Sequence, residues 1–276
     1  MVPLAVPLRI AVELPDRLMN QRLQKVLSQQ GIASRRQAEQ MIREGKVQVN
    51  GETAHLGQKV DPQVDTIAVN GKTLKAEKEP DHLYILLNKP LGVVSTCTDP
   101  QGRPTVLDML PEKLGQNTGL HPVGRLDQNS TGALLLTNHG DLTYKLTHPK
   151  HQISKTYLVW VRGAVSKSTI QTWRKGVMLE GRLTSPAQVR VISPIPKFPV
   201  KRSPYTKPMT CLEVVLTEGR NRQIRKVAEI LGHKVVHLHR QKIGEITLKG
   251  LVSENNRPVK RWRHLKKDEI YYLDKA

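Results

Sequence analysis

The sequence predicts an α+β protein with two domains, and three observations lead to this prediction. Residues 20–80 combine two amphipathic helix patterns with several short strands. Residues 75–82 are polar and charged and contain a proline, as expected for a linker. The chain that follows is rich in aliphatic runs typical of strands. We therefore expect a small N-terminal α/β module at 20–80 and a larger β-rich domain at 83–250, flanked by a disordered extension at 1–19 and a basic C-terminal tail at 251–276.

The small module should begin with two helices. Leu23, Val26 and Leu27 share one face of the first, which Gly31 ends. Ser34 is the expected N-cap of the second helix, because Gln37 three residues later completes a capping box. The short strands that follow are separated by two strong turn dipeptides, Asn50-Gly51 and Asn70-Gly71.

The larger domain should mix strands with short helices. Its strands are expected at 83–87, 133–137, 155–161, 183–192 and 210–217. Its helices are expected at 103–110, 142–146, 165–173 and 224–231. The proline-rich stretch 193–204 is expected to form a basic loop.

The chain is strongly basic, with 44 Lys and Arg against 24 Asp and Glu and a formal net charge of +20. Each phosphate bound by Lys or Arg releases condensed counterions, so this excess favours a nucleic acid as partner. A membrane surface would require a basic amphipathic helix or a lipid anchor, and the sequence has neither in clear form. No apolar run reaches the roughly 18 residues of a membrane span. Prolines interrupt the apolar stretch 1–15, which fits a signal peptide poorly. We expect a cytoplasmic protein without membrane association.

The cysteine and aromatic content argues against a metal site and against one mode of nucleic-acid binding. Cys97 and Cys211 lie far apart, with no Cys or His nearby at metal-ligand spacing, so we expect two reduced thiols and no metal. Aromatic residues are only 4% of the chain, which argues against a platform that stacks many bases.

The most informative stretch is the loop 124–132, which runs into the apolar segment 133–137. It contains Asp127. An acidic residue among turn formers is usually structural. Here, however, the adjoining strand is buried, and a carboxylate at its edge needs either a cationic partner or a catalytic reason to be there.

A second cluster of charge lies at the start of the helix expected at 224–231. Arg220, Arg222, Arg225 and Lys226 crowd its first turns, where the helix dipole disfavours each cation by about 0.3–1 kcal/mol. Such placement requires anions nearby. Phosphates can serve most of these cations, and Asp127 can serve one.

The loop Gly124-Arg125-Leu126-Asp127-Gln128-Asn129-Ser130-Thr131-Gly132 resembles the active-site motif of RNA pseudouridine synthases, in the RsuA, RluB, RluE and RluF branch that modifies ribosomal RNA. Asn88-Lys89-Pro90-Leu91-Gly92 and Lys155-Thr156-Tyr157 are similar to further motifs of this branch, and the resemblance covers about residues 20–250. It implies a catalytic domain built on a mostly antiparallel mixed sheet, with the active cleft across it and no cofactor.

The resemblance also implies roles for individual residues. Asp127 would be the catalytic carboxylate, Tyr157 would lie against the target base, and Arg225 would pair with Asp127. Leu238 would pack under the base, although alone it is simply a core leucine. Arg125, Arg220 and Arg222 would bind the substrate.

Residues 22–51 resemble the S4 RNA-binding domain. In that family this face grips structured RNA by its shape and backbone. The resemblance implies that RNA is bound by the cations Arg22, Lys25, Arg35, Arg36 and Lys46. Scattered charges are usually just a solvated face. Arg35 and Arg36, however, directly follow an N-cap, where helix N–H groups also point at anions.

The function implied is the isomerisation of a uridine to pseudouridine in ribosomal RNA. Uracil is a tolerable leaving group, so one carboxylate can suffice, acting either as a nucleophile at the ribose or as a base. The C-terminal extension favours a large-subunit (23S) target, with the small subunit (16S) as runner-up. We expect a monomer that binds ribosomal RNA or a ribosome assembly intermediate.

Two other classes of protein are also compatible with parts of the sequence. A non-catalytic S4-type RNA-binding or ribosome-associated factor would explain the charge, but not the set Asp127, Tyr157 and Arg225. A DNA-binding protein is a weaker alternative, since no recognition-helix motif is clear. The tail packs six cations into residues 257–267, and a solvated tail and an auxiliary RNA contact are equally compatible with it.

Overall fold

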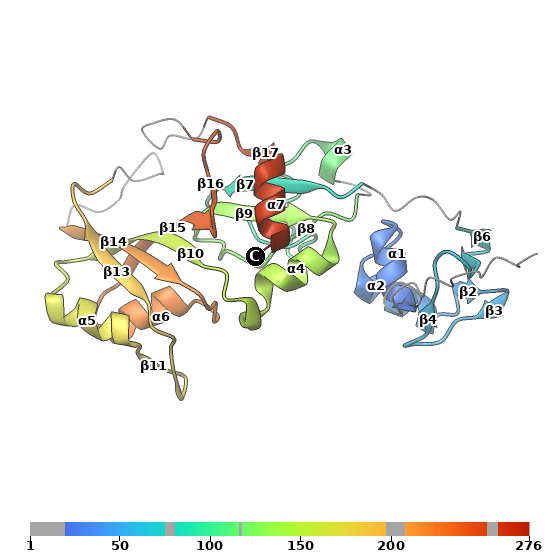
Figure 1. Ribbon diagram of the computed structural model, residues 1–276, viewed down its shortest axis with the longest axis horizontal. Coiled ribbons are helices and arrows are strands. Elements are labelled where there is room, and N and C mark those ends of the chain that lie inside the picture. The colour runs from blue at the N-terminus through green and yellow to red at the C-terminus, as the bar shows by residue number, and fades with distance from the viewer. Residues whose placement is uncertain (1–19, 75–80, 116–117, 197–207, 253–258, 276) are drawn as a thin grey trace, which may run out of the picture. The chain divides into compact units, whose positions relative to one another are not determined.

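The computed structural model describes residues 20–74, 81–115, 118–196, 208–252 and 259–275. It divides into two compact units, Met1–Pro80 and Asp81–Ala276 (Figure 1). The expected extension at 1–19, most of the expected linker and most of the expected proline-rich loop lie outside the described residues.

The N-terminal unit joins two helices to small sheets. Helices α1 (Leu23–Gln29) and α2 (Arg35–Arg43) bury their apolar faces against a four-stranded sheet in the order β3-β2-β5-β6. Its strands are β2 (Val47–Val49), β3 (Glu52–Thr53), β5 (Ile67–Val69) and β6 (Lys72–Thr73), while β1 (Gln21–Arg22) pairs with β4 (Lys59–Val60).

Local chemistry of the N-terminal unit follows the sequence closely. The Ser34 hydroxyl accepts from the Gln37 amide at 3.3 Å, and the Gln37 side chain accepts from the Ser34 amide at 3.0 Å, so the expected capping box is confirmed. Asn50 and Asn70 take the left-handed conformation, with φ of 53° and 50°, as the predicted Asn-Gly turns require.

The C-terminal unit is organised on a nine-stranded sheet in the order β13-β14-β10-β15-β9-β7-β17, with β16 beside β15 and β8 beside β9. Only the β15–β9 pair is parallel among the described strand pairs of this sheet, so the predicted mixed, mostly antiparallel sheet is confirmed. The strands are β7 (Tyr84–Lys89), β8 (His121–Pro122), β9 (Thr131–Thr137), β10 (Lys155–Arg162), β13 (Gln188–Ile192), β14 (Met209–Leu216), β15 (Val235–Ile243), β16 (Ile246–Thr247) and β17 (Trp262–His264).

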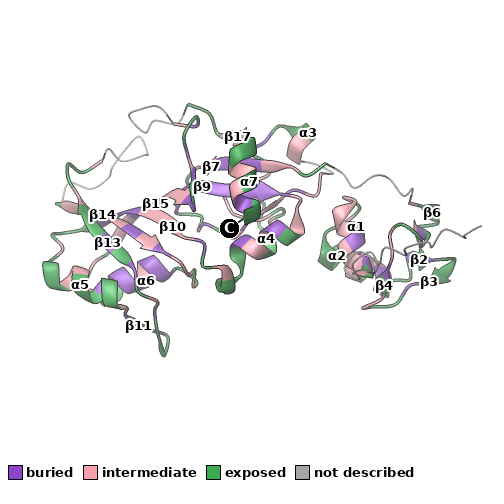
Figure 2. Ribbon diagram, in the orientation of Figure 1, coloured by how far each residue is buried: buried purple, intermediate pink, exposed green. Residues whose placement is uncertain are grey.

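Helices cover the sheet at separate places. Helices α5 (Lys167–Lys175) and α6 (Gln223–Ile230) lie beside β13 and β14 in Figure 1 and share a buried cluster with β10 and β14. Helices α4 (Gly140–Thr147) and α7 (Lys267–Lys275) share a second cluster with β9 and the end of β15. Figure 2 shows β7 and β9 as largely buried ribbons. Shorter elements are α3 (Glu112–Gly115), the 3-10 helix η1 (Pro149–His151) and the hairpin of β11 (Met178–Leu179) and β12 (Arg182–Leu183).

The helix expected at 103–110 is absent from the described structure. The Thr105 amide donates to the Asp108 carboxylate at 2.7 Å, and the Val106 amide donates to the Val94 carbonyl at 3.0 Å. These bonds hold the segment in a turn beside residue 94, so the side chain of Asp108 and a distant carbonyl take the amides that a helix would use.

The separate tail expected at 251–276 is also corrected by the structure, because residues 259–275 belong to the C-terminal unit. Strand β17 pairs with β7 at the edge of the sheet. Leu265 and Leu273 are buried, and Arg263 donates to Glu269 at 2.6 Å. The high density of cations had concealed the alternating and helical apolar positions that drive this packing. None of the described helices is long and apolar enough to span a membrane.

Candidate active site

Asp127 lies in the loop between β8 and β9, at a cavity of about 220 Å³. Gly124 begins the loop with φ of +73°, a conformation that favours glycine. The Ser130 amide donates to the Asp127 carbonyl at 3.0 Å, and the Leu126 amide donates to the Ser95 hydroxyl at 3.1 Å. The loop is thus held by its own backbone and by the Ser95 side chain, and the Asp127 side chain stays 29% exposed toward the cavity.

Strand β15 packs closely against β9, the strand that directly follows this loop. In the parallel β9–β15 pair, Gly132 lies opposite Arg240. A Cβ on Gly132 would lie 2.2 Å from the Arg240 carbonyl oxygen, and its φ is +107°. Only glycine fits this position without displacing β15.

Two guanidinium groups from the start of α6 face Asp127. Arg222 Nη1 lies 3.4 Å and Arg225 Nε 3.5 Å from Asp127 Oδ2. Arg225 is the more buried of the two, with its side chain 13% exposed against 47% for Arg222. It also donates to the Asn129 carbonyl at 2.6 Å and to the Ser130 hydroxyl at 3.1 Å, so it anchors the loop as well as the carboxylate.

The backbone at the start of α6 helps to aim these groups. Arg222 is the N-cap residue and has φ of 52°, which is uncommon for a residue other than glycine. Burial lowers the pKa of Arg225, and the neighbouring Asp127 carboxylate opposes that shift. The Arg225 guanidinium nevertheless remains cationic beside the acid, because arginine is not deprotonated in proteins.

The sheet presents a mostly apolar face to the same cavity. Tyr157 on β10 lies directly opposite Arg240 on β15, and Leu238 lies two residues before Arg240 on the same strand face. Tyr157, Leu238, Ile224 and Ile243 all line the cavity. The structure thus brings the sequence-predicted residues Asp127, Tyr157, Arg225 and Leu238 together at one site.

Arg125 and Arg220 also line the cavity, but in different ways. Arg125 is exposed and makes no ion pair among the described residues. Arg220 donates to the carbonyls of Leu183 at 2.6 Å and Arg182 at 3.1 Å. Its guanidinium therefore holds the β11–β12 hairpin, which leaves it less free for a substrate than the sequence had suggested.

Two buried cations and one half-buried cation near the site were not predicted from the sequence. Lys89 is fully buried and donates to the carbonyls of Ser130 at 2.8 Å and Pro90 at 3.0 Å. Arg240 is 5% exposed and donates to the Ala133 carbonyl at 2.6 Å. Burial lowers the pKa of Lys89 and of Lys155 to about 8 in each case. For Lys155 the available signal was a lysine within the expected strand 155–161, whereas Lys89 and Arg240 lie outside the expected strands.

A histidine pair lies beneath the Asp127 loop. The Thr131 hydroxyl lies 3.0 Å from His237 Nε2 and 2.8 Å from His239 Nδ1. Burial is the main cause that lowers the pKa of His237 to about 3 and that of His239 to about 4. Both rings are therefore neutral at physiological pH. Within the described residues no group of three or more His, Cys, Asp or Glu side chains is placed to hold a metal ion.

The predicted RNA-binding cations of the N-terminal unit fall into two groups. Arg35 and Arg36 are exposed at the start of α2. Arg22 donates to the Gly57 carbonyl at 2.9 Å, and Lys46 pairs with Glu44 at 2.6 Å. Lys25 is half-buried on α1. Arg35 and Arg36 are thus the most available of the five.

Comparisons with known proteins now place the chain in a class. Residues 83–229 match the family described as RNA pseudouridylate synthase, and residues 21–65 match the S4 domain. The first match covers more than half of the chain. The chain therefore belongs to the RNA pseudouridylate synthase family and carries an N-terminal S4 domain, which confirms the family and the isomerase activity expected from the sequence.

Individual relatives are similar over most of their length. The chain is 41% identical over 235 residues to the ribosomal large subunit pseudouridine synthase B of Bacillus subtilis (strain 168), covering 84% of this chain and 88% of the relative. It is 34% identical over 262 residues to the dual-specificity RNA pseudouridine synthase RluF of Escherichia coli (strain K12), covering 95% and 80%. A solved pseudouridylate synthase structure superposes with a TM-score of 0.60 at 30% identity, covering 92% of this chain and 99% of that one.

Proposed function

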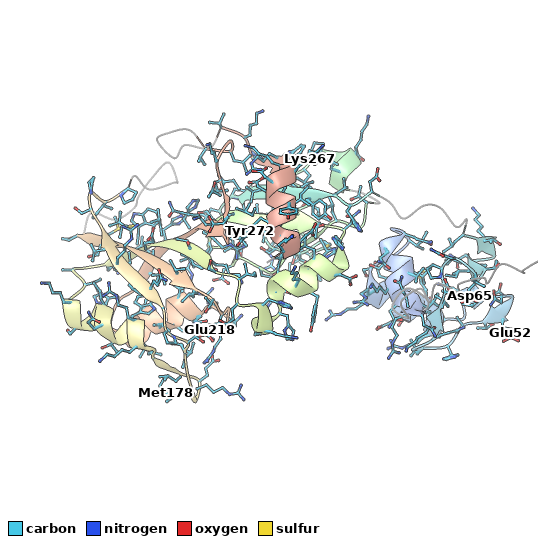
Figure 3. All side chains as sticks on the ribbon, in the orientation of Figure 1. Glu52, Asp65, Met178, Glu218, Lys267 and Tyr272 are labelled. Atoms are coloured by element: carbon cyan, nitrogen blue, oxygen red, sulfur yellow. The ribbon has the colours of Figure 1, made fainter. Side chains whose placement is uncertain are left out.

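We propose that this enzyme isomerises a uridine of ribosomal RNA and that Asp127 is its catalytic carboxylate. The observation that carries the assignment is the difference in interaction partners between the two carboxylates that line the cavity, Asp127 and Glu218. Glu218, labelled in Figure 3, accepts from the Ser185 amide at 2.9 Å and from the Gln223 side chain at 2.7 Å. The Asp127 carboxylate instead faces the cavity, and its ion-pair partners among the described residues are the guanidiniums of Arg222 and Arg225.

The reaction needs one ionised carboxylate. The bond between uracil N1 and ribose C1′ breaks, a bond from uracil C5 to C1′ forms, C5 loses a proton and N1 gains one. Asp127 can attack C1′ as a nucleophile or remove the neighbouring ribose hydrogen as a base. Both routes start from the carboxylate anion, which a close opposite charge stabilises, and Arg222 and Arg225 supply that charge.

The cavity walls suit an extruded base. Taking a nucleotide out of its stack costs a few kcal/mol, which other contacts must offset. Tyr157 offers a ring for stacking, and Leu238 offers an apolar surface on the same face of the sheet. Arg125 and Arg222 at the cavity can contact the RNA backbone, with Arg35 and Arg36 of the S4 domain adding phosphate contacts.

The proposed target is large-subunit (23S) ribosomal RNA, with small-subunit (16S) RNA as the second candidate. Support comes from the relative at 41% identity, which is a ribosomal large subunit pseudouridine synthase. We propose that the enzyme acts as a cytoplasmic monomer on ribosomal RNA or an assembly intermediate. A purely RNA-binding factor would account for the net charge of +20, but it would leave the carboxylate cavity without a role.

The test is to map pseudouridines in the ribosomal RNA of cells that lack the gene. One or more 23S positions should lose pseudouridine and regain it with the wild-type gene. They should not regain it with Asp127→Asn, while Asp141→Asn, an exposed acid on α4, should restore it fully. Unchanged ribosomal RNA in the deletion strain would refute the target, and restoration by Asp127→Asn would refute the role of the carboxylate.

A further inference from the structure

Three aromatic rings form an exposed group where α4 meets η1, and the reaction described above does not use them. The centroid of the Tyr144 ring lies 4.8 Å from that of His148 and 6.3 Å from that of His151, and the two histidine centroids are 6.3 Å apart. Tyr144 is 58% exposed, His148 is exposed and His151 is half-buried. These three residues are called the ring cluster below.

The ring cluster adjoins the cavity that contains Asp127. Thr147, His148 and Pro149 all line this cavity. A Cβ built on Gly124, at the start of the Asp127 loop, would lie 3.7 Å from Thr147 Cγ2, so the end of α4 packs next to that loop. His148 therefore belongs both to the cavity wall and to the exposed cluster. A nucleotide next to one held in the cavity can reach these rings.

The rings are held in place before any ligand arrives. Helix α4 is anchored by the buried side chains of Leu142 and Leu146. The His148 amide donates to the Tyr144 carbonyl at 2.9 Å, and the Lys150 amide donates to His148 Nδ1 at 3.3 Å. A surface that is already ordered loses little conformational entropy when it binds a partner.

A second group of rings in the same unit offers a comparison. The Tyr84 side chain is half-buried, and its hydroxyl lies 3.1 Å from His139 Nδ1, while the His139 ring stacks on His82 at 4.0 Å. None of these three residues lines the cavity. The Tyr144 hydroxyl, by contrast, makes no hydrogen bond to a described residue, and more than half of its side chain is exposed. Packing within the fold therefore does not account for the position of Tyr144.

Exposed rings beside a cavity for an extruded base suit another nucleobase. When one base leaves its stack, the neighbouring bases lose a stacking partner. Aromatic side chains can replace that partner for any base, since every base has a π-face. Lys150 lies between His148 and His151 in the sequence, is exposed and makes no ion pair with a described residue. It can bind a phosphate beside the stacked base.

We propose that Tyr144, His148 and His151 stack the base of a nucleotide that neighbours the extruded uridine. This inference rests on the proposed function, which supplies the RNA and the extruded base. The contact stabilises the opened RNA from outside the cavity, whereas Tyr157 meets the base inside it.

The first test measures tritium release from 23S and 16S ribosomal RNA transcribed with uridine tritiated at C5, because isomerisation breaks that bond. Tyr144→Leu should raise KM about tenfold and leave kcat within about threefold of wild type, since the contact is present before and during the reaction. Tyr144→Phe keeps the ring and should match wild type within about twofold. Tyr271→Leu removes the other exposed tyrosine of the described chain, on α7, and should leave KM unchanged.

Equilibrium binding to the same RNA separates this inference from the proposed function. In the Asp127→Asn enzyme, Tyr144→Leu should weaken RNA binding by about the same tenfold factor. Absence of tritium release by the wild-type enzyme would refute the proposed function, and the two affinities would still test the platform without turnover.

The second test asks whether the rings contact a base. A synthetic fragment of ribosomal RNA that contains the mapped uridine is made with an abasic residue as its 5′ or its 3′ neighbour. With one of these two RNAs, wild type should bind about tenfold more weakly than with the intact fragment, and Tyr144→Leu should lose nothing further, because ring and base form one contact.

Two results would overturn the assignment. A wild-type KM and affinity for Tyr144→Leu on purified RNA would assign the exposed rings to a protein partner or to solvent. An effect of Tyr144→Leu that persists undiminished with both abasic RNAs would mean that the ring contacts something other than a neighbouring base.

Discussion

The two units of the chain hold their positive charge in different ways. In the N-terminal unit none of the described lysines and arginines is buried, and most, such as Arg35 and Arg36 on α2, are exposed. In the C-terminal unit Lys89 and Arg240 are buried and Arg225 is only 13% exposed. Surface cations attract a polyanion over a distance and are screened by salt. Buried cations instead fix loops and carboxylates, and they act on the proton affinity of their neighbours.

This difference teaches where each kind of charge is useful. Exposed charge contributes little to the stability of a fold but much to binding nucleic acid. Buried charge is costly unless it is paired, so its position is tightly specified by the packing around it. The catalytic unit should therefore be sensitive to small structural changes that the S4 domain would tolerate.

The largest effect is expected from Gly132→Ala, which would break the parallel strand pair that buries Arg240. The added Cβ would lie 2.2 Å from the Arg240 carbonyl oxygen at a φ of +107°. We expect a loss of about 3 kcal/mol or more in the free energy of unfolding. All three tryptophans lie in the C-terminal unit, so urea denaturation followed by tryptophan fluorescence reports on this unit.

Gly163→Ala is the matched control, because φ there is +78° but no atom lies within 4 Å of the added Cβ. This variant should lower the free energy of unfolding by only about 1 kcal/mol. Equal losses in the two variants would show that the close approach at Gly132 is unimportant.

The two guanidiniums beside Asp127 offer a comparison within the catalytic unit. Arg225→Gln should slow isomerisation about 100-fold, because it removes a largely buried partner of Asp127 that also holds Asn129 and Ser130. Arg222→Gln should slow it less than about tenfold, since that side chain is 47% exposed. The rate of tritium release at saturating RNA measures both effects. A larger defect in Arg222→Gln than in Arg225→Gln would mean that Arg222 is the more important partner of Asp127.

A third prediction concerns stability in acid. The pKa of His237 is lowered to about 3 in the folded chain, below the roughly 6.5 of an unfolded histidine. Between these values the unfolded state binds the proton more readily, so stability is lost as the pH falls below about 6.5. When the pH falls from 7.5 to 5, this histidine should lower the free energy of unfolding of the catalytic unit by about 2 kcal/mol.

In His237→Gln, the free energy of unfolding measured by urea denaturation should no longer show this loss between pH 7.5 and pH 5. His55→Gln, at an exposed position of the N-terminal unit, should leave the pH dependence of the tryptophan transition unchanged. Identical pH profiles for wild type and His237→Gln would contradict the burial of a neutral ring.

The smallest effect should come from the exposed cations of the S4 domain. The double variant Arg35→Gln and Arg36→Gln should weaken RNA binding by about tenfold and reduce the salt slope of binding by about 2. Turnover at saturating RNA and the free energy of unfolding should not change. Loss of turnover at saturation would mean that these arginines do more than attract the RNA.

Sequence reasoning succeeded where interactions are local. The capping box of Ser34 and Gln37, the Asn-Gly turns and the apolar face of α6 all depend on residues a few positions apart. The loop of Asp127 was found in the same way, since its motif is contiguous. The mixed sheet was anticipated through the family resemblance rather than from periodicity.

Sequence reasoning failed where burial depends on distant pairing. Arg240 is buried because β15 pairs with β9, more than a hundred residues earlier in the chain, and Lys155 gains its environment from the same arrangement. The C-terminal segment was taken for a tail because its cations outnumber the apolar residues that dock it, such as Leu265 and Leu273. Local patterns do not contain these contacts.

The most direct test of the account is the purified Asp127→Asn enzyme on ribosomal RNA tritiated at uracil C5. The variant keeps the size of the side chain and removes its charge. We predict no measurable tritium release, with the affinity for the RNA within about threefold of wild type, because binding depends on the cations of both units. Tritium release at the wild-type rate would contradict the claim that this carboxylate performs the chemistry.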